Sequence, residues 1–174
     1  MTLELYDQDP GTVLAIVAHP DDLEYGAAAA VSKWTTAGNR VDYLLVTRGE
    51  AGIDTLAPVE AARVRELEQR ASAAIVGVTD VEFLDYPDGV VEYGTGLRRE
   101  LAEAIRRYRP DTVLLFNHRD SWGFPGSWMP PWHRCALMAP TWRPWATIRW
   151  PIPNSSGHTA NRQVSERAWP RRCR

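Results

Sequence analysis

The stretch TVLAIVAHPDDLEYG, residues 12–26, places a histidine and two adjacent carboxylates directly behind an apolar run. Residues 12–18 are continuously apolar and rich in β-branched side chains, a pattern typical of a strand buried on both faces. His19, Asp21 and Asp22 follow where such a strand ends. This junction of a buried strand with charged groups governs both the fold and the chemistry that we expect.

The first 117 residues continue as an alternation of predicted strands and helices. Further strands are predicted at 41–47, 81–86 and 111–117, and helices at 23–37, 58–77 and 96–110. Strand–helix alternation of this kind implies right-handed crossovers and a parallel sheet with helices on both faces. We therefore predict an α/β, Rossmann-like fold, followed by an irregular C-terminal part.

Three of the four predicted strands end in polar segments. These segments are AHPDD after the first strand, TRGEAG after the second and NHRD after the fourth. The carboxyl ends of parallel strands meet at one edge of the sheet, where ligands of such folds bind. The sequence therefore predicts a functional site at that edge.

The HPDD segment has two open interpretations. Asp21 or Asp22 could cap the following helix, with His19 a satisfied polar residue at the strand end. Two adjacent carboxylates, however, repel each other unless a cation or a proton lies between them. Imidazole and carboxylate suit Zn²⁺ or Fe²⁺, so His19 and Asp22 are predicted metal ligands and Asp21 a base. His118 and His133 are the candidates for a third ligand.

The ordered motifs AHPDDLEYG, TRGEAG, AARVRELEQRAS, FLDYPDG and FNHRDSWGFPGSW resemble the LmbE/PIG-L family of zinc-dependent N-acetylglucosaminyl deacetylases. The resemblance spans about residues 12–134 and implies an enzyme with zinc, or alternatively Fe(II), as its cofactor. The implied reaction is removal of an N-acetyl group from an N-acetylglucosamine-type amino sugar or glycoconjugate by metal-activated water. The resemblance assigns metal ligands (His19, Asp22, His133), a catalytic base (Asp21) and substrate-binding residues (Glu50, Arg63). His118 is the candidate that would substitute for the family's polarising histidine as a second catalytic residue.

Some of these assignments have a plainer alternative. Glu50 could be an ordinary loop acid, and Arg63 could be a solvated helix charge with ion-pair partners at helical spacing. Asp85 and Asp88 are interpreted as turn formers rather than as catalytic groups.

The segment MPPWHR, residues 129–134, departs from the family pattern. Trp132 and Pro130 stand where the family usually has an aspartate and another histidine before the last ligand. A ligating histidine commonly donates its other N–H to such an acceptor, whose loss weakens metal binding. An inactive or truncated relative is therefore the alternative to an active deacetylase.

The composition changes after residue 120, and the resemblance ends beyond His133. Residues 1–120 carry 12 basic against 21 acidic side chains, whereas residues 121–174 carry 8 arginines against one acid and seven of the eight tryptophans. We therefore divide the chain into a deacetylase-like domain, 1–134, and an atypical tail, 135–174.

Two hypotheses account for this tail. A frameshift or truncation after Ser121 would give such a composition, and translation of the neighbouring reading frames would reveal a continuing strand–helix pattern. The rival hypothesis is a genuine basic and aromatic tail that binds an anionic polymer.

Composition and motifs exclude several other classes. No apolar run reaches the length of a membrane span, the acidic N-terminus does not resemble a signal peptide, and the two cysteines have no metal-ligand spacing. The turn after the first strand lacks GxGxxG and GxxxxGK[ST], which argues against a nucleotide site. We expect a cytoplasmic protein with a small-molecule partner and neither membrane nor nucleic acid; no oligomeric state is predicted.

Overall fold

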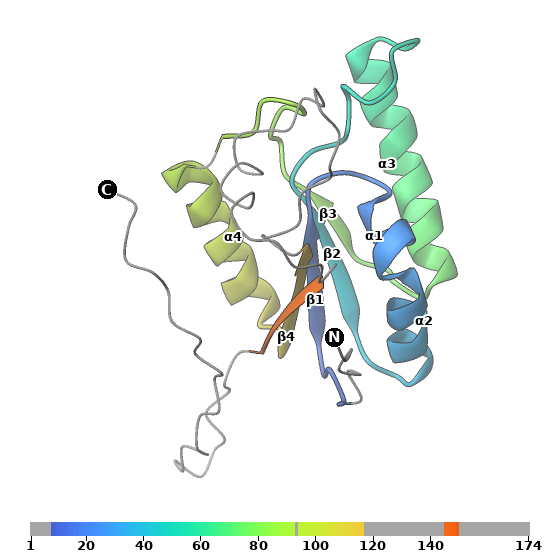
Figure 1. Ribbon diagram of the computed structural model, residues 1–174, viewed down its shortest axis with the longest axis vertical. Helices are drawn as coiled ribbons and strands as arrows, with labels where there is room; N and C mark the ends of the chain where they lie inside the picture. The colour runs from blue at the N-terminus through green and yellow to red at the C-terminus, as the bar shows by residue number, and fades with distance from the viewer. Residues whose placement is uncertain (1–7, 93, 117–144, 150–174) are drawn as a thin grey trace, which may run out of the picture.

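A five-stranded sheet in the order β3-β2-β1-β4-β5 carries helices on both faces (Figure 1). The computed structural model describes residues 8–92 and 94–116, together with the backbone of 145–149. The elements are β1 (Val13–Val17), α1 (Asp22–Gly26), α2 (Ala28–Thr36), β2 (Val41–Leu45), α3 (Pro58–Ile75), β3 (Val81–Phe83), α4 (Thr95–Tyr108), β4 (Thr112–Phe116) and β5 (Trp145–Arg149).

Four of the five strands are parallel. β1 lies between β2 and β4 and pairs with both in parallel, Val13 facing Val41 on one side and Thr112 on the other. β3 continues the parallel pairing beyond β2. The predicted α/β fold with a parallel sheet is confirmed.

Three details differ from the sequence-based expectation. The helix predicted at 23–37 is two helices, because the backbone leaves helical geometry at Ala27, directly after Gly26, a poor helix former. β3 is shorter than predicted, ending before the turn that contains Pro87. Residues 145–149, expected to be irregular, form β5, which pairs antiparallel with β4.

The sheet divides the core into two layers because successive residues of a strand face opposite sides. Val13, Ala15 and Val17 of β1 pack against residues of α1, α2 and α3, while Leu14 and Ile16 pack against residues of α4. All five are buried. Figure 1 shows the same division among the labelled helices, with α4 on one side of the sheet and α1, α2 and α3 on the other.

This division places a switch point at the carboxyl end of β1. From β1 the chain moves outward to β2 and β3 through α1, α2 and α3 on one face. It then returns past β1 to β4 through α4 on the other face. Connections diverge here, and such points bind ligands in open α/β sheets.

Among the described residues, no helix combines the length and the apolar character needed to cross a membrane.

The buried core gives a direct test of this fold. Leu14 has no exposed surface, so Leu14→Ala should lower the free energy of unfolding by about 2–5 kcal/mol through lost burial and a cavity. Leu67, on α3, is 56% exposed, so Leu67→Ala should cost no more than about 0.5 kcal/mol. Denaturant unfolding followed by circular dichroism measures both, and equal losses would contradict the assigned core.

Candidate metal and catalytic site

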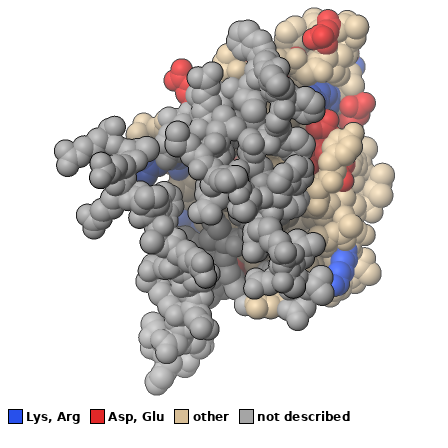
Figure 2. Space-filling model, in the orientation of Figure 1, with Lys and Arg blue, Asp and Glu red and all other residues tan. Residues whose placement is uncertain are grey.

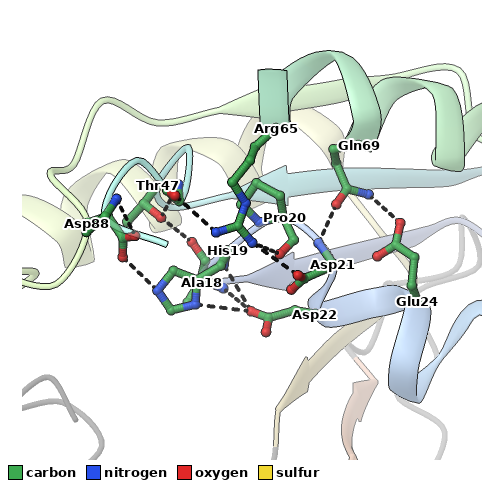
Figure 3. A network of polar contacts seen from close by, with 12 residues as sticks. Ala18, His19, Pro20, Asp21, Asp22, Glu24, Thr47, Arg65, Gln69 and Asp88 are labelled. Atoms are coloured by element: carbon green, nitrogen blue, oxygen red, sulfur yellow. Dashed lines mark hydrogen bonds and ion pairs between the residues drawn. The ribbon is translucent and has the colours of Figure 1, made fainter. Parts of the chain in front are cut away.

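The HPDD segment forms a tight turn between β1 and α1. Asp21 has a φ of 76°, in the left-handed region that costs a non-glycine residue about 1–2 kcal/mol. This conformation sends the two neighbouring carboxylates to different partners (Figure 3). Asp21 turns toward Arg65 of α3, whereas Asp22 turns back toward His19. The turn thus separates two charges that would otherwise repel each other.

Asp22 stabilises the turn from inside. Its Oδ2 atom accepts hydrogen bonds from the backbone N–H of Ala18, at 3.2 Å, and of His19, at 2.9 Å. Asp21 occupies the N-cap position of α1, but its side chain makes no capping hydrogen bond. The capping interpretation therefore does not describe Asp21, and Asp22 binds N–H groups that precede the helix.

His19 and Asp22 present the donor atoms that a metal ion requires. The Nδ1 atom of His19 lies 3.7 Å from Oδ2 of Asp22, too far for a hydrogen bond. Two ligand atoms about 2.1 Å from a tetrahedral zinc ion lie about 3.4 Å apart, so this separation fits shared coordination. Within residues 8–92 and 94–116, no group of three histidine, cysteine or acidic side chains is arranged to hold a metal. Two of the three predicted ligands, His19 and Asp22, lie among the described residues, and the third, His133, lies outside them.

Asp88 orients His19 from the opposite side. Oδ1 of Asp88 lies 2.9 Å from Nε2 of His19, and its Oδ2 accepts the backbone N–H of Ala51 at 3.1 Å. Ligating histidines commonly donate their second N–H to a carboxylate in this way. From its sequence context alone, Asp88 is expected only to form a turn. Its signal was DYPDG at the end of the third strand, which reaches the same edge of the sheet as AHPDD.

Burial and neighbouring charges shift the pKa values of His19, Asp22 and Asp88. Burial lowers the pKa of His19, yet the hydrogen bond to Asp88 and the charges of Asp22 and Asp88 raise it above its ordinary value. Burial raises the pKa of Asp22, and its hydrogen bonds offset only part of this. The hydrogen bond from His19 lowers the pKa of Asp88. The pKa of His19 and that of Asp22 are thus both above their ordinary values, which is consistent with a site that attracts cations.

Arg65 ties three segments of the site together. Its Nη2 atom donates to the carbonyl of Pro20, at 3.0 Å, and to Oδ2 of Asp21, at 3.1 Å, while Nη1 donates to the carbonyl of Gly49 at 3.0 Å. A Cβ atom at Gly49 would lie 2.7 Å from Nη1, and one at Gly52 only 2.1 Å. The glycines of TRGEAG therefore make room for the guanidinium group.

Glu50 joins the loop after β2 to the turn after β3. Its Oε1 atom accepts a hydrogen bond from the backbone N–H of Asp88 at 2.7 Å. The side chain of Asp88 in turn contacts His19. Glu50 also lines an open hollow of about 330 Å³ between this loop, the start of α3 and residues 85–87. These contacts leave its predicted role in substrate binding a prediction.

Of the remaining predicted site residues, only Arg63 is described, and it does not reach this cluster. Arg63 is exposed and donates to Oε1 of Glu60 at 2.8 Å, whereas Arg65, two residues later, reaches the turn. Arg65 was not predicted because each arginine has an acidic residue at helical spacing in the sequence, Glu60 for Arg63 and Glu68 for Arg65. His118 and His133 lie outside the described residues, so their roles stay predictions.

The surface has the polarity that a cation site requires. Acidic side chains of described residues are exposed toward the upper part of the face shown in Figure 2, on the side of α1 and α3. The side chain of Asp21 is itself 61% accessible. Such a surface favours cations and disfavours a phosphate ligand.

Comparison with known sequences points to one family. The profile of the family PIG-L: GlcNAc-PI de-N-acetylase matches residues 14–128. Diacetylchitobiose deacetylase of Thermococcus kodakarensis is 35% identical over 134 residues, covering 74% of this chain and 47% of the relative. The 1D-myo-inositol 2-acetamido-2-deoxy-alpha-D-glucopyranoside deacetylase of Kineococcus radiotolerans is 28% identical, covering 71% and 43%. The chain spans about half the length of these curated relatives.

Solved structures share the fold. N,N'-diacetylchitobiose deacetylase from Pyrococcus horikoshii, complexed with its inhibitor MPG, superposes with a TM-score of 0.66 at 29% identity, covering 74% of this chain and 49% of that one. The 4-carboxy-2-hydroxymuconate hydratase GalB from Pseudomonas putida superposes with a TM-score of 0.61 at 23% identity, covering 72% and 54%. The second likeness concerns the fold alone, so the fold by itself does not define the reaction.

Arg63 and Arg65 of α3 form a matched pair for testing the site. Arg65→Met removes the three hydrogen bonds to Pro20, Gly49 and Asp21 and should lower the free energy of unfolding by about 1–3 kcal/mol. Arg63→Met should leave the unfolding midpoint unchanged, since that side chain is solvated. Urea denaturation of both variants measures the difference, and a larger loss for Arg63→Met would contradict the assigned contacts.

Proposed function

Because the chain belongs to the PIG-L family (GlcNAc-PI de-N-acetylase), we propose that it removes the N-acetyl group from an N-acetylglucosamine-containing amino sugar or glycoconjugate. The relatives named above are deacetylases of such compounds, which supports an amide hydrolase. The proposal includes a divalent metal, zinc or alternatively Fe(II), held by His19, Asp22 and His133.

A single observation carries this proposal. His19 and Asp22 face each other across 3.7 Å at the carboxyl end of β1, and the exposed carboxylate of Asp21 lies beside them. A base next to a candidate pair of metal ligands is the arrangement that hydrolysis of an amide by an activated water requires.

The reaction follows from the positions of these groups. When bound, the metal would polarise the acetamide carbonyl and lower the pKa of a water molecule. Asp21 would accept the proton of the attacking water and later return it to the leaving nitrogen. Arg65 holds that carboxylate in place, and Asp88 holds the His19 ring. Acetate and a free sugar amine are the products.

The hollow beside Glu50 is the proposed place for part of the sugar substrate. Glu50 and Arg63 remain the predicted substrate-binding residues, and His118 the predicted polarising group. The domain division at residue 134 and the cytoplasmic location also remain predictions.

Deacetylation and its metal requirement can be tested together. The purified chain should release acetate from N-acetylglucosaminyl compounds such as diacetylchitobiose, and elemental analysis should find near-stoichiometric zinc or iron. Asp21→Ala should keep the metal and lower turnover at least about 100-fold, because only the base is removed. Asp22→Ala should lose both metal and turnover.

The parent and the two variants separate the alternatives. A folded parent without metal or acetate release would favour the inactive relative. Equal metal content in Asp21→Ala and Asp22→Ala would contradict the proposed division of roles between the two carboxylates.

The role of Asp88 can be tested through metal affinity. Asp88→Asn removes the negative charge that faces His19 and should weaken metal binding about 10–100-fold. Asp85→Asn, three residues earlier and 90% exposed, is the matched control and should retain parental affinity. Competition with a chromogenic chelator measures both constants, and identical affinities would refute this role.

A further inference from the structure

A buried glutamine of α3 contacts the turn that carries Asp21. Gln69 is 2% exposed, and its Oε1 atom accepts the backbone N–H of Asp21 at 2.8 Å. Its Nε2 atom donates to Oε1 of Glu24 in α1 at 2.9 Å. Figure 3 shows the chain of contacts from Glu24 through Gln69 to Asp21. The reaction described above uses neither Gln69 nor Glu24.

The chemistry of the neighbours determines how the Gln69 amide is oriented. An ionised carboxylate only accepts hydrogen bonds, and a backbone N–H only donates them. The NH₂ group of Gln69 must therefore face Glu24, and its carbonyl oxygen must face Asp21. The second oxygen of Glu24, Oε2, is buried and accepts no hydrogen bond from any described residue. Rotating the amide would leave Glu24 without its donor and place an N–H group against the N–H of Asp21.

We propose that Gln69 is a positioning residue for Asp21, with Glu24 fixing the orientation of its amide. This inference rests on the proposed function, in which Asp21 is the base. Gln69 binds the backbone of Asp21, whereas Arg65 binds its carboxylate. The two side chains are four residues apart on α3 and so lie on one face of the helix. One rigid element thereby holds the left-handed backbone and the side chain of the same residue.

The experiment uses the full chain and a charge swap. Gln69→Leu removes both hydrogen bonds, and Gln69→Glu sets a carboxylate against that of Glu24. The double variant Glu24→Gln/Gln69→Glu exchanges the two groups, so that a donor again faces position 69 and an acceptor again faces the N–H of Asp21. Thr35→Val is the matched control, because it removes a partly buried hydrogen bond to the carbonyl of Val76 at the far end of α3.

Amide hydrogen exchange at Asp21 and the steady-state constants are both measured. In Gln69→Leu and Gln69→Glu, the Asp21 amide should exchange about tenfold faster. Their kcat should fall about 10–100-fold with little change in KM, because a displaced base slows the chemical step without weakening substrate binding. The double variant should recover both amide protection and most of kcat. Thr35→Val should change neither, even where it lowers the unfolding midpoint.

Either of two results would overturn the proposal. One is parental kcat in Gln69→Leu despite rapid exchange at Asp21, and the other is failure of the double variant to restore protection. An inactive parent would instead refute the proposed deacetylation. Hydrogen exchange at the Asp21 amide then still decides whether Gln69 positions this backbone. Loss of amide protection in Gln69→Leu and its recovery in the double variant would support that positioning. Unchanged protection in Gln69→Leu would overturn it.

Discussion

The left-handed backbone at Asp21 is the constraint on which the site depends. Two adjacent carboxylates of an ordinary turn would repel each other, and their side chains would compete for the same cation. A φ of 76° at Asp21 sends one carboxylate to Arg65 and the other to the backbone N–H groups before α1. The conformation costs energy, and hydrogen bonds from α3 offset it. The proposed metal ligand, Asp22, and the proposed base, Asp21, can therefore be adjacent residues.

The three strand ends around this turn play different parts. The turn after β1 supplies the candidate ligands, and the loop after β2 supplies glycines that admit Arg65. The segment after β3 supplies Asp88, which bonds the far side of the His19 ring. A carboxylate behind a histidine fixes the ring and increases its basicity, as in many metal sites. Since these loops are far apart in sequence, only the parallel sheet brings their groups together.

The sequence pattern predicted the fold because the spacing of apolar residues reflects which faces of each element are buried. Continuous apolar runs mark strands covered on both faces, and Pro58 and Gly77 mark the ends of α3. The break at Ala27 was not predicted, because Gly26 is a single poor helix former followed by a run of alanines, which are the best helix formers. β5 was missed because its partner, β4, is distant along the chain and its own segment has no periodicity. Long-range pairing of that kind leaves little local trace.

For the site, the sequence by itself determined which groups stand at the end of the first strand, since HPDD and its buried strand are contiguous. It also determined the family, through the order of its motifs. Only the tertiary structure decided which helix residues reach the turn. Arg63 and Arg65 carry the same charge on one helix, yet their directions differ by about 200° at 100° per residue, so one meets solvent and the other the site. The same geometry brings Gln69 to Asp21 and Asp88 to His19, contacts that depend on packing between elements rather than on any local pattern.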